Sequence, residues 1–309
     1  MTAIRSLDEL ITALRDAPNR RVAVAAGHDP NTIRAAARAV AEKIAAVTLV
    51  GDGARIDTLC AELDLDRDAF TVIDEADVNA AGEIARDLVR DGHADVLMKG
   101  LIGTGDYMRL ILDKTVGLLP KDAVLTHITV MELPAFVERH GKLLFVSDVA
   151  IIPRPDKPTK KKILRYCVDA AHSFGIDKPR AALLAASEKV SLKMPATGEA
   201  AEITVDAVVE FPDAVVHGPL ALDVAISPEA CAIKGLDTPV GGAADILVFP
   251  NIESGNIFYK SSTLLAGGRL AAAVVGTAAP CVLTSRADSE ESKFLSIAFG
   301  CRLAADRTA

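Results

Sequence analysis

The alternation of short apolar segments with amphipathic segments is the feature that most constrains how this 309-residue chain can fold. Between residues 21 and 100, nearly continuous apolar runs typical of buried strands alternate with stretches of helical periodicity. We expect strands over residues 21–27, 47–51, 70–74 and 95–100, and helices over residues 31–44, 54–63 and 78–91, with Asp29 or Asn31 as a helix N-cap. This alternation predicts a parallel sheet with helices on both faces.

The pattern changes after residue 123. Two long strand-like runs, residues 123–133 and 141–153, are joined by a short segment and predict an antiparallel pair. Helices are expected over residues 159–174 and 290–303, and strands over residues 180–187 and 244–250. The apolar run 270–284 predicts a buried helix end, a turn and a strand. Together these elements predict two α/β domains, residues 1–126 plus 271–309 and residues 127–270.

Charge, apolar segments and cysteine content limit the classes of protein to which this chain can belong. The net charge of −8 argues against broad nucleic-acid binding. The N-terminus lacks the uninterrupted apolar stretch of a signal peptide, and the longest apolar run is shorter than the roughly 20 residues that span a bilayer, so we expect a cytoplasmic protein without membrane contact. The five cysteines, an odd number without close pairs, predict buried free thiols: Cys60, Cys167, Cys231, Cys281 and Cys301.

Several strand ends carry residues suited to anions, at the sheet edge where α/β proteins bind ligands. After the strand at 95–100, a glycine-containing turn opens a helix with Thr104 near its start and Arg109 one turn later. Backbone N–H groups at such a turn can bind an anion, with Arg109 adding charge. The alternative is an ordinary strand–helix turn. The turn matches neither a full G-x-G-x-x-G nor a P-loop pattern.

The strand at 244–250 ends in Pro250-Asn251, and Gly255-Asn256 is expected to start a helix that carries Lys260. The asparagines can bind a phosphate or an amide, and Lys260 supplies a charge; alternatively the asparagines only cap a turn and a helix. The strand in 271–285 ends at Ser285-Arg286, where a guanidinium can bind phosphate or a developing oxyanion. The alternative there is a helix cap at Ser289–Ser292, which would leave both residues free.

Two further groups of residues, the lysines after residue 156 and the histidines, each have two interpretations. The lysine run Lys157, Lys160, Lys161 and Lys162 is either a solvated face or an electrostatic guide for a polyanion. The six histidines have no metal-ligand spacing, which predicts no metal site; His127 and His217 are of interest because they lie on strand-like runs.

The order of these motifs resembles that of the phosphate acetyl/butyryltransferase family over residues 20 to 303. The resemblance rests on four motifs: Gly100-x-x-x-Thr104-Gly-Asp106-x-x-Arg109, Asp148-x-Ala-x-x-Pro153-x-Pro155, Pro250-Asn251-x-x-x-Gly255-Asn256-x-x-Tyr259-Lys260 and Ser285-Arg286. The segment LTSRADSEESKFLSIA is closer to the butyryltransferase branch. The resemblance implies an isocitrate/isopropylmalate-dehydrogenase-like fold with parallel-rich sheets, an interdomain cleft and commonly a homodimer.

The implied activity is reversible transfer of a short acyl group between coenzyme A (CoA) and inorganic phosphate through a ternary complex. CoA, acyl-CoA, phosphate and acyl phosphate would be substrates and products, without a metal or other cofactor. Ser285 and Arg286 would be catalytic. The residues implied in substrate binding are Thr104, Arg109, Asn251, Asn256 and Lys260.

Position 292 departs from the family pattern. Phosphotransacetylases carry there an aspartate proposed to deprotonate the CoA thiol, and this chain has Ser292. Serine cannot replace a carboxylate as a base without a partner. Our hypothesis is that Arg286 and neighbouring charge lower the pKa of the thiol, which is about 8.5 when free.

Three other functions stay open. A metal-dependent decarboxylating dehydrogenase would need a carboxylate cluster that the spacing does not show. A long-chain phosphate acyltransferase of lipid synthesis shares the fold. A non-catalytic acyl-CoA-binding regulatory protein would explain Ser292, although Ser285, Arg286 and Arg109 argue against it.

Overall fold

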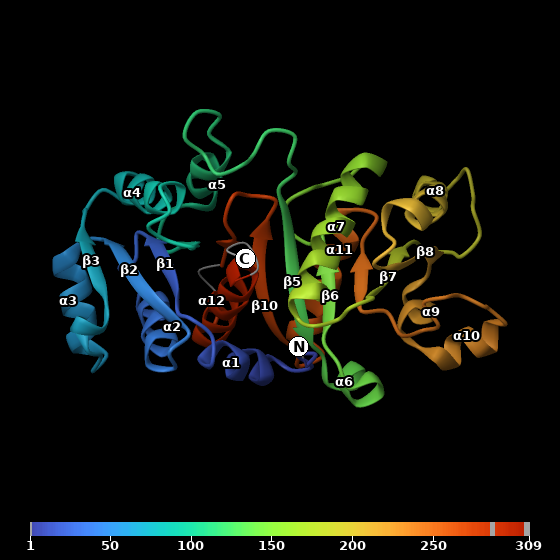
Figure 1. Ribbon diagram of the computed structural model, residues 1–309, viewed down its shortest axis with the longest axis horizontal. Coiled ribbons are helices and arrows are strands. Elements are labelled where there is room, and N and C mark those ends of the chain that lie inside the picture. Colours follow the sequence, from blue (N-terminus) through green and yellow to red (C-terminus); the bar gives the residue numbers. More distant parts are fainter. Residues whose placement is uncertain (1, 285–287, 306–309) are drawn as a thin grey trace. The chain divides into compact units, whose positions relative to one another are not determined.

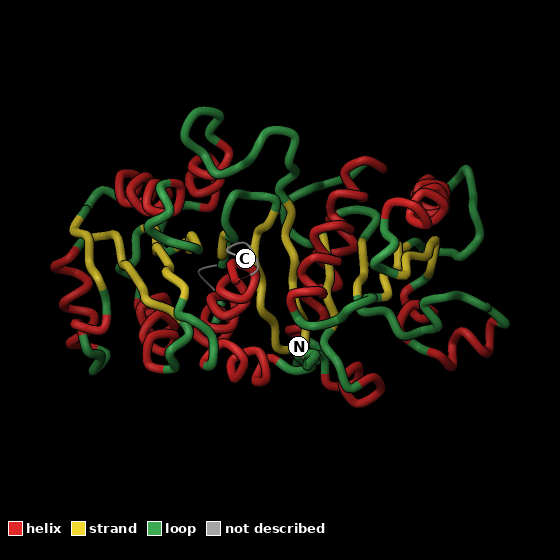
Figure 2. Tube along the Cα trace, in the orientation of Figure 1, coloured by secondary structure: helices red, strands yellow, loops and turns green. Residues whose placement is uncertain are grey.

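Parallel strands dominate the computed structural model, which describes residues 2–284 and 288–305 (Figure 1). The chain divides into two compact units. We call Leu7–Leu125 with Leu270–Ala309 the N-terminal unit, and Met1–Ser6 with Thr126–Arg269 the central unit. In both, strands and helices succeed one another along the chain (Figure 2). The expected α/β class with a mostly parallel sheet is confirmed.

The sheet of the N-terminal unit has the strand order β3-β2-β1-β4-β11-β10. Its first five strands are parallel, and β10 runs antiparallel to β11. The strands are β1 (Arg20–Ala25), β2 (Ala45–Gly51), β3 (Thr71–Asp74), β4 (Val96–Lys99), β10 (Arg269–Val275) and β11 (Cys281–Val282). The carboxyl ends of β4 and β11 therefore lie side by side.

Two groups of helices pack on this sheet. One group is α4 with α5, and the other is α12 with α1 and α2. The helices are α1 (Leu7–Arg15), α2 (Pro30–Ala41), α3 (Gly53–Glu62), α4 (Val78–Arg90), α5 (Thr104–Leu112) and α12 (Glu290–Ala305), with a short 3₁₀ helix η1 (Arg67–Ala69). Aspartates cap the starts of α2, α3 and α4, and the cap of α2 is Asp29, one of its two expected caps.

The sheet of the central unit has the order β5-β6-β9-β7-β8. The antiparallel β5–β6 pair confirms the expected excursion, and the other neighbours are parallel. The strands are β5 (Thr126–Glu132), β6 (Leu144–Ser147), β7 (Arg180–Leu184), β8 (Val215–Leu220) and β9 (Ile246–Val248); the helices are α6 (Pro134–His140), α7 (Lys157–Ser173), α8 (Pro195–Glu210), α9 (Leu222–Ile226), α10 (Pro228–Lys234) and α11 (Ile252–Leu264).

Ion pairs join α7 to α8. Lys157 contacts Glu202 and Asp206 at 3.0 Å, and Lys161 contacts Asp206 at 2.6 Å and Glu210 at 2.7 Å. Lys160 pairs with Glu199. Three members of the lysine run are thus neutralised by α8, which does not favour the electrostatic-guide interpretation.

Three sequence expectations were wrong. The run 270–284 forms strands β10 and β11 around a turn instead of beginning as a helix end, because β10 is buried over almost its whole length in the sheet. The second strand-like run after residue 123 contains only the four residues of β6, since the chain turns at Asp148. Helix α11 begins at Ile252 and not at Gly255-Asn256.

No helix within residues 2–284 and 288–305 combines the length and the apolar character needed to cross a membrane.

Candidate functional site

The carboxyl edge of the N-terminal unit is built on two adjacent parallel strands, β4 and β11. The chain leaves β4 at Gly100, where an added Cβ would lie 2.2 Å from the backbone oxygen of Ala26. Only glycine fits so close to the end of β1. The chain leaves β11 through Leu283 and Thr284, so the two predicted anion-binding segments start next to each other.

Tyr107 on α5 connects both strands. Its hydroxyl donates a hydrogen bond shared between the backbone oxygens of Leu97, at 3.1 Å, and Val282, at 3.3 Å. The ring is fully buried, and burial raises the pKa of Tyr107 well above its usual value, so the hydroxyl stays protonated. Tyr107 thereby fixes α5 relative to the strand that leads to Ser285. Sequence reasoning missed this positioning role, because one of the two oxygens that accept the Tyr107 hydrogen bond belongs to Val282, which is remote in the chain.

Thr104 and Arg109 both lie on the exposed side of α5. Thr104 is the first residue of the helix, and Gly103 before it provides no side-chain cap. The Arg109 side chain is 80% exposed and pairs with Asp106 one turn earlier. Exposed ion pairs of this kind are worth about 1 kcal/mol or less, so Arg109 can exchange Asp106 for an anionic substrate.

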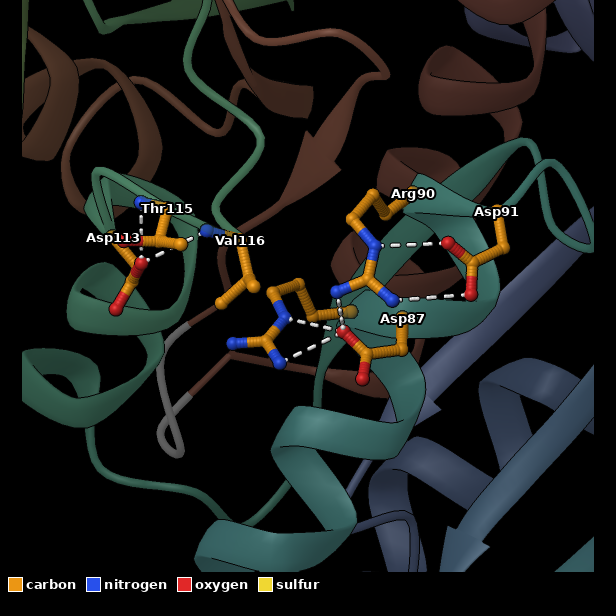
Figure 3. A network of polar contacts seen from close by, with 7 residues as sticks. Asp87, Arg90, Asp91, Asp113, Thr115 and Val116 are labelled. Atoms are coloured by element: carbon orange, nitrogen blue, oxygen red, sulfur yellow. Dashed lines mark hydrogen bonds and ion pairs between the residues drawn. The ribbon is translucent and has the colours of Figure 1, made fainter.

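The arginines of neighbouring α4 are engaged in a separate network (Figure 3). Arg90 binds Asp87 and Asp91, while Asp113 accepts the backbone N–H groups of Thr115 and Val116 in the turn after α5. These backbone hydrogen bonds, that of Val116 above all, lower the pKa of Asp113. These contacts stabilise the end of α4 and the turn after α5. Because the α4 arginines are engaged in them, Arg109 is the better anion-binding candidate on these two helices.

Ser285 and Arg286 lie outside the described residues. The helix that follows them is well defined: the Ser292 N–H donates to the Ser289 hydroxyl at 3.1 Å, and the two hydroxyls lie 3.1 Å apart. The expected cap at Ser289–Ser292 is therefore confirmed. Ser292 has a structural role where the family pattern has a carboxylate.

A buried ion pair fixes α12 to α2. Lys293, only 3% exposed, donates to Asp29 and to the Thr32 hydroxyl, both at 3.1 Å. Burial favours the neutral form of Asp29, but the hydrogen bonds from Thr32 and the charge of Lys293 outweigh it and lower the pKa of Asp29. The start of α12, which follows Ser285-Arg286, is thereby anchored.

In the central unit, Asn251 and Asn256 have structural partners. Asn251 is the N-cap of α11 and accepts the Ser254 N–H at 3.0 Å, which confirms its capping role. The Asn256 amide donates to the backbone oxygen of Val149 at 3.0 Å. Lys260 is exposed on the same helix and forms no ion pair within the part of the chain that the structure describes. Of these three residues, Lys260 is the one available to an anion.

Asp148 organises the turn that Asn256 contacts. Its buried carboxylate accepts the Thr126 hydroxyl at 2.8 Å and the backbone N–H groups of Ala150, at 2.7 Å, and Ile151, at 2.9 Å. An added Cβ at Gly255 would lie 2.2 Å from the Asp148 backbone oxygen. We call Asp148, Gly255, Asn256 and the backbone they hold the latch. Sequence reasoning identified Asp148 only as part of a motif. The sequence signal for its role in the turn is the position of a carboxylate directly after a buried strand.

A cavity of about 580 Å³ lies at the carboxyl edge of the central sheet. Four segments line it: residues that follow β6 (Pro153, Arg154), β7 (Ala185, Ala186) and β9 (Pro250, Asn251, Glu253), and the start of α8 with its N-cap (Met194, Pro195, Ala196, Thr197, Glu199) together with Lys160. Its volume is within the 300–1,000 Å³ range of small-molecule sites. The cavity lies entirely within the central unit.

Other reactive side chains are unsuited to covalent chemistry. All five cysteines are buried, as expected, and burial raises the pKa of the Cys301 thiol to about 12 and that of Cys167 further. His127 is buried with its ring edge-on to Tyr259, and burial lowers the pKa of His217. Within residues 2–284 and 288–305, no group of three or more His, Cys, Asp or Glu side chains could hold a metal ion.

The whole chain is similar to known acyltransferases. It is 38% identical to the phosphate butyryltransferase of Clostridium acetobutylicum over 305 residues, covering 98% of this chain and 100% of that protein. It is 38% identical to the phosphate acetyltransferase of Thermotoga maritima, covering 94% and 97%. The crystal structure of a branched-chain phosphotransacylase from Enterococcus faecalis superposes with a TM-score of 0.81 at 34% identity, covering 92% of this chain and 99% of that one.

Fold and sequence thus define an acyltransferase of the phosphotransacylase class. The sequence pattern of the phosphate acetyl/butaryl transferase family matches residues 6–89 and 77–301. The chain belongs to this family.

Proposed function

We propose that this protein catalyses the reversible transfer of a short acyl group, acetyl to butyryl, between CoA and inorganic phosphate. The observation that carries the proposal is the family match, which extends over nearly the whole chain and includes the strand ends described above. In the direction of acyl phosphate, a phosphate oxygen attacks the thioester carbonyl, the C–O bond forms and the C–S bond breaks. The phosphate proton passes to the thiolate, which leaves as free CoA.

Charge stabilisation is the main contribution expected from the protein. The carbonyl oxygen gains negative charge during attack, and Arg286 with Ser285 would donate hydrogen bonds to it or to phosphate. Arg109 and Thr104 on α5 would bind anionic substrate. Tyr107 would hold that helix in a fixed position relative to the strand that leads to Ser285. A ternary complex supplies orientation, so no covalent enzyme intermediate and no metal or other cofactor is required.

Lys260 is proposed to bind a phosphate of CoA, since it is exposed and forms no ion pair within the described residues. Asn251 and Asn256 would act on binding mainly by shaping α11 and the turn it contacts. The two units are proposed to form an isocitrate/isopropylmalate-dehydrogenase-like pair of domains with a substrate cleft. The division of the chain into two compact units at residues 125–126 and 269–270 supports the two-domain part of this proposal.

A homodimer is the proposed assembly. Three large apolar side chains, Ile257 and Leu264 on α11 and Leu265 at its C-cap, are 66–86% exposed, at the spacing of a helical stripe. A second copy of this chain is the partner expected to cover them. Sedimentation velocity should give twice the monomer mass of 32.4 kDa, and replacement of Leu264 by glutamate should shift the species toward monomer. A monomeric wild-type protein would contradict this proposal.

The cytoplasm is the proposed location, because five buried free thiols suit a reducing compartment. Recovery of the native protein in a periplasmic or membrane fraction would contradict it.

The activity is tested by phosphate-dependent release of free thiol from acetyl-CoA, propionyl-CoA and butyryl-CoA. Turnover should require phosphate, and the ratio of kcat/KM among the three thioesters would identify the preferred acyl group. Folded protein that binds CoA without turning over any of them would contradict the proposal. Such a result would point to a long-chain enzyme or to a regulatory acyl-CoA-binding protein.

A further inference from the structure

Helix α8 has an apolar side that is exposed to solvent. Val205, Val208 and Val209 on the helix are 72–82% exposed, and Leu192 in the turn before it is fully exposed. The buried side of α8 is formed by other residues, and its acidic side chains pair with lysines of α7. Single exposed apolar side chains are common, but a group of neighbouring ones indicates a contact with another molecule. The exposed side of α8 is therefore a candidate interaction surface.

This side of α8 has small residues in its first half and valines in its second half. Gly198, Ala201, Val205 and Val208 follow one another at intervals of three or four residues, so they lie along one side of the helix. An added Cβ at Gly198 would meet no atom within 4 Å, so the surface there is open. The surface is consequently low near the start of the helix and raised near its end.

A second copy of α8 is complementary to this surface when it runs in the opposite direction. Two identical helices that pack antiparallel about a two-fold axis bring the start of each against the end of the other. Val208 of one copy would then lie over Gly198 of the other, and Val205 over Ala201, at two equivalent places. Parallel packing would instead place valine against valine and leave the glycines facing a gap, which costs contacts.

The charges at the ends of α8 support the same direction. Lys193, directly before the N-cap Met194, is exposed and forms no ion pair within the described part of the chain. Glu210 is the last residue of α8, and its side chain is 46% exposed. It contacts Lys161 at 2.7 Å, and a carboxylate can accept a second donor. Antiparallel packing brings Lys193 of each copy to Glu210 of the other, whereas parallel packing would bring like charges together.

The turn before α8 is held by hydrogen bonds. The Ser191 N–H donates to the Thr197 hydroxyl at 2.9 Å, and that hydroxyl donates to the Met194 backbone oxygen at 2.7 Å. The Met194 N–H donates to the Ser191 backbone oxygen at 3.0 Å. Leu192 and Lys193 are therefore presented by an ordered segment, so little conformational entropy would be lost on contact.

We propose that α8 forms a second contact between copies of this chain, in which two α8 helices pack antiparallel about a two-fold axis. This contact is separate from the proposed dimer contact at α11. A helix of 16 residues offers a strip about 24 Å long and about 10 Å wide. Since a stable interface buries about 800 Å² on each partner, the α8 contact is the weaker of the two. It joins α11 dimers into larger assemblies at high protein concentration.

The test uses the full chain with Leu264→Glu, which is expected to disrupt the α11 contact, so that α8 alone can join two copies. Sedimentation velocity from low to high micromolar concentration should show a monomer–dimer equilibrium. Adding Val208→Glu should raise its dissociation constant about tenfold or more, because a carboxylate would enter the apolar contact. Val208 is 79% exposed in the single chain, so circular dichroism should show an unchanged fold.

Charge reversal tests the direction of packing in the same background. Lys193→Glu should raise the dissociation constant about fivefold, and the further change Glu210→Lys should restore it. Lys43→Glu is the matched control and should have no effect, because Lys43 is an exposed lysine of the N-terminal unit that forms no ion pair within residues 2–284 and 288–305.

Three results would overturn the proposal. They are a Leu264→Glu protein that stays monomeric at every concentration, an association that Val208→Glu does not weaken, and a double charge reversal that associates no better than Lys193→Glu. Failure of the α11 proposal is distinguishable, since the Leu264→Glu protein would then remain associated at low concentration. Dissociation of that species by Val208→Glu would still support the α8 contact.

Discussion

Replacement of Arg286 by alanine is expected to lower kcat for phosphate-dependent CoA release by about 100- to 1,000-fold. The guanidinium is the strongest hydrogen-bond donor in the segment after β11, and charge on the reacting carbonyl oxygen develops only as phosphate attacks. Removing the donor should therefore affect kcat more than the KM of either substrate. Initial rates at saturating and at limiting acyl-CoA, with folding checked by circular dichroism, measure this split.

Arg286→Lys serves as the conservative variant and should recover part of the lost rate, since it restores a point charge without the bidentate geometry. Ser292→Ala is the matched control at the start of α12. Its hydroxyl contacts Ser289 in the helix cap, so a small loss of stability and little change in kcat are expected. A loss in Ser292→Ala as large as that in Arg286→Ala would refute the hypothesis that no dedicated thiol base is needed at position 292.

Gly255→Ala is expected to have the largest effect on stability, lowering the free energy of unfolding by about 3 kcal/mol. The new Cβ would lie 2.2 Å from the backbone oxygen of Asp148 and 3.1 Å from the ring of Phe249. The oxygen belongs to a turn held by the Asp148 carboxylate, so it cannot retreat without breaking those hydrogen bonds. Thermal unfolding should shift downward by roughly 5–10 °C.

Gly198→Ala is the control for this change. Gly198 is also a helical glycine of the central unit, and an added Cβ there meets no atom within 4 Å. Alanine is the better helix former by about 1 kcal/mol, so this variant should be as stable as the wild type or slightly more stable. Equal destabilisation by the two substitutions would show that the close approach to Asp148 is not the cause.

The strands and helices from β1 to β4 were predictable because hydrophobic periodicity and packing agree there. Helix α8 was not predicted, and its surface explains why. Its charged side chains Glu199, Glu202 and Asp206 face α7 in ion pairs, whereas Val205, Val208 and Val209 are 72–82% exposed. Its buried face consists of Thr197, Ala200, Ile203 and Ala207. Because the exposed valines add apolar residues outside this face, the sequence does not show the clear periodicity by which buried faces are recognised.

The candidate site shows a similar limit. Residue types at strand ends predicted anion-binding segments, and those of β4 and β11 do start side by side. The role of Asn256 was not predictable, because its partner Val149 is 107 residues away in the chain. Tyr107 was missed for the same reason, since one of its acceptors, Val282, belongs to the distant strand β11. Local patterns identify which residues can bind a ligand, but not which of them already bind the backbone.

The latch also determines how this protein can be recombined with its relatives. The turn from Asp148 to Pro153 and the first turns of α11 share the Asn256–Val149 and Ile252–Pro153 hydrogen bonds, and Gly255 leaves no space between them. Two stretches that are distant in the chain are therefore one module. A chimera that takes either stretch from another phosphotransacylase must take both, because each is shaped to the backbone of the other.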